Sequence, residues 1–332
     1  MARLTRRRFL TATGAAIAAG TVTPWLGPAR VFGQQSAPVP FKIGPVVLGD
    51  LANVAPILVG MEKGFYKENG VAVEMIPFTG GPPLLRGVLA GTVDLGISGA
   101  TDPLVFRAAG APIRGVAVVT EKNHFVLVAA PGITRVEDLK GATIGVTAPG
   151  ASTWVFARLL AKRQGWDPAR DIRIVGLGGF DAQIASMRRG ETKAFVWGDG
   201  GAVAEVLGVG RIILRLDDIT PKWISQLAYA TSDTVRRRKE DLRKVLRGHF
   251  QAMKFCRDNA DETIRIAARG IGWTEPATRR AYEVSRPLMS ADGRFDVEAY
   301  RLMQETLLEL GVLSVRLPLV DHFTTEFTPV KI

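Results

Sequence analysis

The chain has 332 residues, of which 47% are hydrophobic, and it carries 43 lysines and arginines against 32 acidic residues, a formal charge of +11. This length allows two domains, each with its own core. The single cysteine excludes an internal disulfide and a cysteine-based metal site, and the three histidines lie too far apart to bind a metal as a pair on one helix. Without the five arginines of residues 1–33 the charge is +6. The basic residues do not alternate with aromatic residues, as they do in proteins that bind nucleic acids.

Residues 1–33 have the pattern of an export signal. Arg6 and Arg7 precede Phe9-Leu10, and residues 11–22 form a weakly apolar run that is too short to span a membrane permanently. The order T-R-R-x-F-L resembles the twin-arginine signal, which exports folded proteins, and an ordinary secretory signal is the alternative. We expect cleavage near Gly33, a periplasmic location, and a linker over residues 34–40.

Downstream of the linker, short apolar runs alternate with segments of helical pattern. Strands are predicted over residues 41–48, 71–77, 93–98, 113–119 and 125–129. Helices are predicted over residues 54–63 and 80–90 and from Asp102-Pro103 onward, with glycine or proline at several of their ends. This β-α-β-α-β order predicts a mostly parallel sheet covered by helices.

The same alternation starts again near residue 135. Strands are predicted over residues 143–146, 172–177, 194–197, 211–214 and 227–231, and helices over residues 152–162, 181–188 and 202–207. The last third is helical, with apolar residues three and four apart over residues 242–253 and 297–310. We therefore predict an α/β protein with two lobes and two crossover strands, near residues 125–130 and 227–231. Lobe one comprises residues 40–125 and 230–332, and lobe two residues 126–229.

Three segments of the chain resemble one known family. Residues 60–74 have the sequence GMEKGFYKENGVAVE, residues 89–96 LAGTVDLG, and residues 136–146 VEDLKGATIGV. They resemble motifs of the periplasmic solute-binding proteins of ABC importers, in the group for nitrate, sulfonate and taurine, whose relatives bind thiamine pyrimidine precursors. A fourth segment, residues 187–194, departs from the family by placing Lys193 where an acid is usual.

The resemblance implies a two-lobed, type II-like periplasmic binding fold and a protein that captures a small anion by closing its lobes. The partner would be the ABC permease of the inner membrane, and the protein would act as a monomer with no cofactor, metal or catalytic residue. One alternative is an enzyme with the same two-lobed fold, of the pyrimidine-precursor or menaquinone-pathway type. The other is a sensor that presents its ligand to a membrane receptor.

Candidate ligand-binding residues come from four turns that join a strand to a helix. In α/β sheets such turns lie at the carboxyl ends of the strands, and the helix N-termini that follow favour anions. Ordinary helix capping is the alternative for each single residue. The candidates from these turns are Asp50, Asn53, Thr79, Gly80, Gly81, Ser98, Ala100, Thr101, Gly150, Ser152 and Thr153.

Three further candidates come from aromatic residues at strand ends and from one histidine. Phe180 and Trp197 are predicted to contact the organic part of a ligand, although Asp199 stands where family members often have a proline. His124, just before the first crossover strand, is a candidate for binding a ligand oxygen, and a structural role is the alternative.

Overall fold

The computed structural model describes residues 37–332. Two sheets of five strands form the framework. The first has the order β2 (Val71–Met75), β1 (Val39–Pro45), β3 (Leu95–Gly99), β10 (Gln226–Thr231) and β4 (Ile113–Thr120). The second has the order β7 (Arg173–Gly176), β6 (Thr143–Val146), β8 (Ala194–Trp197), β5 (Val126–Ala129) and β9 (Arg211–Arg215).

Each sheet contains four strands that run in one direction and one strand that runs against them. The reversed strands are β10 in the first sheet and β5 in the second. Both are the first strands that the chain forms after passing from one sheet to the other, between residues 120 and 126 and between residues 215 and 226. The predicted two-lobed α/β fold with mostly parallel sheets is confirmed. The exact lobe boundaries, at residues 126 and 229, stay a prediction.

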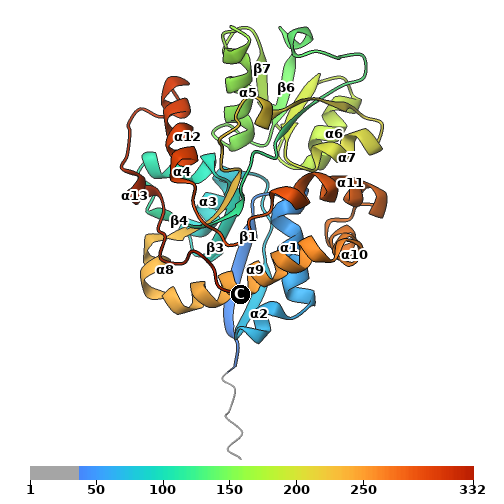
Figure 1. The fold of residues 1–332 in the computed structure, drawn as a ribbon. Coiled ribbons are helices and arrows are strands. Elements are labelled where there is room, and N and C mark those ends of the chain that lie inside the picture. Colours follow the sequence, from blue (N-terminus) through green and yellow to red (C-terminus); the bar gives the residue numbers. More distant parts are fainter. Residues whose placement is uncertain (1–36) are drawn as a thin grey trace, which may run out of the picture. The chain divides into compact units, whose positions relative to one another are not determined.

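Helices cover both sheets, as Figure 1 shows. In the sequence up to β10 they are α1 (Leu51–Glu62), α2 (Phe65–Glu68), α3 (Gly81–Leu89), α4 (Thr101–Ala108), α5 (Ser152–Arg163), α6 (Phe180–Arg188) and α7 (Gly201–Val206). The helical last third consists of α8 (Ser232–Arg237), α9 (Lys239–Asp258), α10 (Ala260–Ile271), α11 (Glu275–Ser285), α12 (Val297–Glu309) and α13 (Leu319–His322). Helix α11 packs against α1 and α10 and also against α7, so the C-terminal part contacts helices of both sheets.

The segment over residues 60–74 owes its pattern to packing. Gly64 adopts a left-handed φ of 81°, which ends the first helical stretch, and α2 follows it. The Tyr66 ring is buried against Gly60 of α1, and its hydroxyl group donates to Nδ1 of His249 on α9 at 2.9 Å. Burial lowers the pKa of His249 to about 4, so the imidazole is neutral and can accept this bond. The segment therefore fixes the contact between α1, α2 and α9.

Replacing Gly60 with Ala is expected to destabilise the protein by about 1–3 kcal/mol, the usual cost of overpacking a core. A Cβ atom at residue 60 would overlap the Tyr66 ring, which is buried. Urea unfolding measures the change. Gly179→Ala is the control, because no atom lies within 4 Å of its Cβ position and its φ of −68° suits alanine. Equal stability of the two variants would contradict this account.

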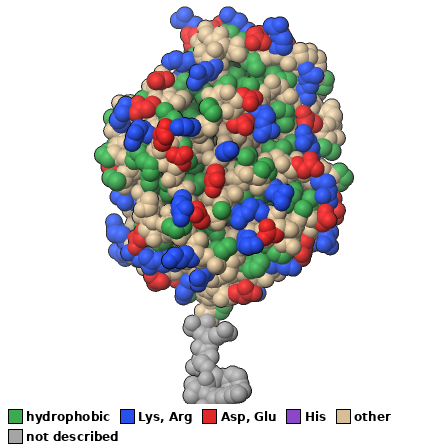
Figure 2. Space-filling view, in the orientation of Figure 1, with side chains coloured by type: hydrophobic (Ala, Val, Ile, Leu, Met, Phe, Trp, Pro, Cys, Tyr) green, Lys and Arg blue, Asp and Glu red, His purple; other side chains and the backbone are tan. Residues whose placement is uncertain are grey.

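Charged side chains cover the surface without a block of one sign. Figure 2 shows basic and acidic side chains intermixed over one face, and many of them form surface ion pairs. Within the part of the chain that the structure describes, no helix is both long and apolar enough to span a bilayer.

Candidate functional site

A small cavity lies between the two sheets, where helices of both lobes begin. Its volume is about 20 Å³, roughly the space of one water molecule. The lining residues come from the strand ends and turns before α1, α4, α5 and α7, from the first turns of α4 and α5, and from the first crossover: Val46, Val47, Asp50, Gly99, Asp102, Phe125, Thr147, Ala151, Ser152, Thr153, Trp197 and Gly198. The cavity is therefore the place where the two lobes meet around a common centre.

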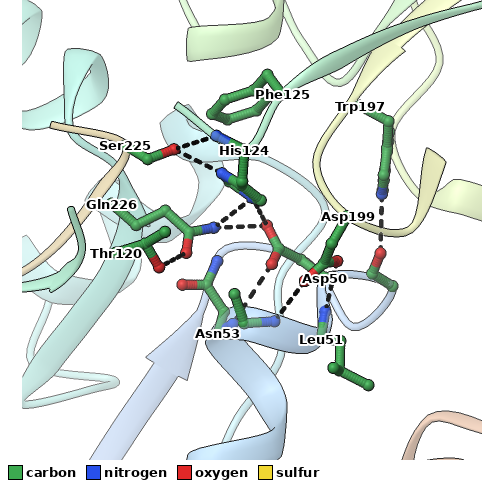
Figure 3. Close-up of polar contacts among 12 residues, drawn as sticks. Asp50, Leu51, Asn53, Thr120, His124, Phe125, Trp197, Asp199, Ser225 and Gln226 are labelled. Carbon is green, nitrogen blue, oxygen red and sulfur yellow. Dashed lines mark hydrogen bonds and ion pairs between the residues drawn. The ribbon is translucent and has the colours of Figure 1, made fainter. Parts of the chain in front are cut away.

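A buried network joins the turn before α1 to both crossovers (Figure 3). Oδ2 of Asp50 accepts from Nε2 of His124 at 3.2 Å and from Nε2 of Gln226 at 2.7 Å. Nδ1 of His124 lies 2.5 Å from Oγ of Ser225, and the Thr120 hydroxyl donates to the Gln226 amide oxygen at 2.7 Å. His124 lies in the first crossover and Ser225 and Gln226 in the second, so the network ties the two connections together.

The charge of His124 follows from its neighbours. Burial by itself lowers its pKa, but the Asp50 carboxylate, with a smaller effect from Asp199, outweighs burial and raises the pKa above the ordinary 6.5. The contact between His124 and Asp50, at 3.2 Å, is therefore strongest when the imidazole is protonated. Gly198 lies against this pair, because a Cβ atom at residue 198 would overlap the His124 ring.

Asp199 follows β8 of the second sheet and reaches across to helix α1 of the first. Its two carboxylate oxygens accept from the backbone N–H groups of Leu51 at 2.9 Å and Ala52 at 2.7 Å, as Figure 3 shows for Leu51. Burial, followed by repulsion from Asp50, raises its pKa to about 7, although His124 and the two N–H groups act in the opposite direction. The N-terminus of α1 is thus capped by a carboxylate from the other lobe.

Asp102 makes the corresponding contact from the first lobe to a helix of the second lobe. It lies in the first turn of α4, after β3 of the first sheet, and its Oδ1 accepts from the backbone N–H of Ser152 at 2.6 Å and from the Ser152 hydroxyl at 2.7 Å. The Thr101 hydroxyl also bonds to the Ser152 hydroxyl. Burial raises the pKa of Asp102 to about 7, opposed by its hydrogen bonds to Ser152 and Ser98.

Aromatic side chains hold the lobes together beside the cavity. The Trp197 indole donates its N–H to the carbonyl of Gly49 at 2.8 Å, from the second sheet to the turn before α1. The Phe180 ring centre lies 5.5 Å from that of Trp197 and 5.6 Å from that of Trp273. Trp197 lines the cavity and Phe180 does not. Both side chains are thus engaged with protein groups in this arrangement.

The structure brings most of the sequence-predicted site residues together. Four line the cavity: Asp50, Ser152, Thr153 and Trp197. Others contact lining residues or lie in the same turns: Asn53, Thr79, Gly80, Gly81, Ser98, Ala100, Thr101, His124 and Phe180. Asn53 is buried on α1, and neither polar atom of its amide has a partner among the described residues.

Gly150 is not part of this centre. Its φ is 80°, and no atom lies within 4 Å of the position of a Cβ atom, so it serves the turn before α5. Five further residues of the centre are not among the sequence-predicted candidates: Asp102, Asp199, Phe125, Ser225 and Gln226. For Asp102 the sequence pattern predicts only a helix start, and for Asp199 the available signal is an acid where family members often have a proline. Ser225 and Gln226 are polar residues directly before the apolar strand predicted over residues 227–231, and this position indicates a candidate site residue.

The described residues contain no group of three histidine, cysteine or acidic side chains placed to hold a metal ion. Cys256 is buried on α9, and burial raises its pKa to about 12, so its thiol is unreactive.

Comparisons with known proteins agree with the resemblance seen in the sequence. The chain is 22% identical over 221 residues to the putative binding protein YtlA of Bacillus subtilis, an alignment that covers 65% of this chain and 66% of the relative, slightly less than two thirds of its length. It is 26% identical over 208 residues to a putative aliphatic sulfonates-binding protein of Escherichia coli, covering 61% of this chain and 64% of that protein.

Solved structures share the fold. The alkanesulfonate-binding protein SsuA from Xanthomonas axonopodis pv. citri, bound to MOPS, superposes with a TM-score of 0.73 at 18% identity, over 85% of this chain and 96% of SsuA. The family model described as NMT1/THI5 like matches residues 51–263, well over half of the chain. This protein therefore belongs to the NMT1/THI5-like family.

Proposed function

We propose that this protein is the substrate-binding component of an ABC importer and captures a small anion, of the sulfonate, nitrate or carboxylate type, by closure of its two lobes. The observation that carries the proposal is the convergence of helix N-termini from both lobes on one central cavity. Helices α1 and α4 start from the first sheet and α5 from the second, and their N–H groups and dipoles favour negative charge. The names of the relatives that bind sulfonates support the same class of ligand.

A ligand that contacts both lobes stabilises the closed arrangement by its contacts to both. The two crossovers, with their buried network around Asp50 and His124, are the natural hinge for this motion. In this proposal the protein works as a monomer in the periplasm and delivers its ligand to an inner-membrane permease.

The hydrogen bonds of the polar side chains at the site favour a binding role over a catalytic role. Ser225, His124 and Asp50 form a serine–histidine–aspartate chain, but Ser225 is buried and does not line the cavity. Both ring nitrogens of His124 already contact protein groups, Asp50 and Ser225, so the ring is engaged in the buried network and not directed at the cavity. The Ser152 hydroxyl, which lines the cavity, donates to a carboxylate and has no histidine beside it.

A thermal-shift screen of the mature protein against sulfonates, nitrate, carboxylates and pyrimidines tests the function. A true ligand at 100 times its Kd stabilises the folded state by about 2.7 kcal/mol, which raises Tm by about 4 °C in a chain of this length. Calorimetry then gives the affinity of each hit. Stabilisation by cationic compounds alone would exclude the proposed ligand class, and turnover of a hit would exclude the binding role.

Export through the twin-arginine route is a separate prediction, on residues that lie outside the described part of the chain. Replacing Arg6 and Arg7 with lysine should leave the precursor in the cytoplasm, because twin-arginine export requires the arginine pair. Fractionation of cells followed by immunoblotting measures the distribution. Unchanged delivery to the periplasm would show that the general secretory route is used.

A further inference from the structure

A groove lies on the surface beside the second sheet. It has a volume of about 450 Å³ and is formed by the less buried face of α5, the start of β7 and the loop that joins them. Figure 1 shows α5 and β7 side by side in this part of the molecule. The groove shares no lining residue with the central cavity, so the two are separate features.

Three arginines line the groove, and none of its lining residues is acidic. They are Arg158 on α5, Arg170 in the loop and Arg173 at the start of β7. Arg170 lies 3.6 Å from the Asp167 carboxylate, whereas Arg158 and Arg173 form no ion pair within residues 37–332. We refer to this feature as the arginine groove. Its positive charge is left largely uncompensated by the part of the chain that the structure describes.

Two acids lie close in the sequence, but both are engaged by their own loop. Asp167 accepts from a backbone N–H of the loop at 2.9 Å, and Asp171 accepts from the backbone N–H of Asp167 at 2.8 Å. Asp171 also lies 3.7 Å from the Lys140 ammonium group. These contacts stabilise the loop, so neither carboxylate neutralises the arginine groove.

Arg158 gives the strongest indication of a ligand. The carbon of its guanidinium group lies 4.8 Å from the centre of the Trp154 ring, one helical turn earlier, and this contact holds the planar group in place. Its Nε atom is buried and has no acceptor among the described residues. A buried donor on a charged group is costly when it lacks an acceptor. An oxyanion in the groove would supply this acceptor, because a guanidinium group binds such anions through two parallel hydrogen bonds.

We propose that the arginine groove is a second binding site, which takes a doubly charged oxyanion of the phosphate type. Two guanidinium groups without acidic partners match two negative charges, and a phosphate group carries nearly two near neutral pH, with three acceptor oxygens. Ile172 and Ile174 also line the groove and offer apolar surface to the organic part of a phosphate ester. The inference goes beyond the proposed function and does not depend on it, since the central cavity is elsewhere.

Calorimetric titration with inorganic phosphate, at an ionic strength held constant with sodium chloride, tests the site. Arg158→Gln and Arg173→Gln should each weaken phosphate binding by about tenfold, because each removes a charged donor. The matched control is Arg211→Gln, which should change the affinity by less than about twofold. Arg211 and Arg173 are both exposed, and each is the first residue of an edge strand of the second sheet. The control therefore removes the same charge at a matched position outside the groove.

Three results would overturn the site. The first is the absence of phosphate binding by the unaltered protein. The second is an unchanged affinity in both groove variants, which would show that phosphate binds elsewhere, for example in the central cavity. The third is an equal loss in Arg173→Gln and Arg211→Gln, which would reflect only the overall charge. Arg173→Gln keeps the test decisive if replacing half-buried Arg158 destabilises α5, because the Arg173 side chain is exposed.

Vesicles distinguish the two sources of such a phosphate group. The protein is sedimented with vesicles of phosphatidylcholine that contain phosphatidic acid, and with vesicles of phosphatidylcholine alone. Binding that requires phosphatidic acid and is lost in Arg173→Gln but kept in Arg211→Gln would assign a lipid headgroup to the groove. Phosphate binding in solution without vesicle binding would assign a soluble phosphate ester.

Discussion

Replacing Trp197 with Ala is expected to lower the free energy of unfolding by about 3–5 kcal/mol, the usual loss when a buried aromatic side chain is truncated. Trp197 is 1% exposed, and its ring packs beside Phe180 at the end of β8. The indole N–H also donates to Gly49 across the lobes, so truncation leaves the Gly49 carbonyl without this donor. Urea unfolding of the ligand-free protein measures the change.

Two further variants separate the contributions to this effect. Trp197→Phe keeps most of the packing and removes the hydrogen bond, so it should cost about 1–2 kcal/mol. Trp154→Ala is the control, because Trp154 is only half-buried, on the surface of α5 against Arg158, and should cost about 1 kcal/mol or less. If Trp197→Ala weakened ligand binding but left stability unchanged, Trp197 would be a ligand platform and not a contact between the lobes.

The architecture was largely predictable because it is encoded in local patterns. Apolar runs of strand length alternate with helical segments, and β1, β3, β6 and β8 occur within a few residues of their predicted positions. The direction of β10 was not predictable in this way. Its apolar sequence suits any buried strand, and only its partners, β3 and β4, make it antiparallel to its neighbours.

The site was predictable only as far as it depends on local turns. Ser152 and Thr153 were selected because small polar residues follow a strand and begin a helix, and they do line the cavity. The two acids at the site, Asp102 and Asp199, accept hydrogen bonds from residues that are far away in the sequence. Asp102 reaches a residue 50 positions away, and Asp199 reaches one 148 positions away. No spacing rule links such residues, since their meeting depends on closure of one lobe on the other.

Closure of the lobes and binding of an oxyanion are both expected to strengthen as the pH falls from about 8 to about 5. Three groups are responsible: Asp102 and Asp199, whose pKa values rise to about 7 in this closed arrangement, and His124, whose pKa is also raised. In an open, solvated cleft the two carboxyl groups would return toward their ordinary pKa of 3.8. The closed form therefore holds more protons between these values, and its advantage is lost as the pH rises through about 7.

The groups around Asp102 and Asp199 each raise or lower the pKa of these two carboxyls. Asp199 faces Asp50, which raises its pKa, and His124 and the N–H groups of α1, which lower it. Asp102 faces the Ser152 and Ser98 side chains, which lower its pKa, and burial outweighs them. A bound anion adds negative charge beside both carboxyls and raises their pKa values further. Anion binding should thus take up protons, and the affinity should improve by up to about tenfold per pH unit for each proton taken up.

Calorimetry of an oxyanion hit across this pH range, in buffers of different ionisation enthalpy, measures both the affinity and the number of protons. The distance between the lobes, measured with spin labels, reports closure separately from unfolding. Unfolding has its own pH dependence: the pKa values of the buried histidines His249 and His322 are lowered to about 4, so these two residues make the folded state less stable as the pH falls. Asp102→Asn should remove one proton from the linkage, because asparagine does not titrate. An affinity that is flat from pH 8 to pH 5 would show that neither carboxyl takes up a proton, and one that weakens on acidification would identify a ligand that donates hydrogen bonds to the ionised aspartates.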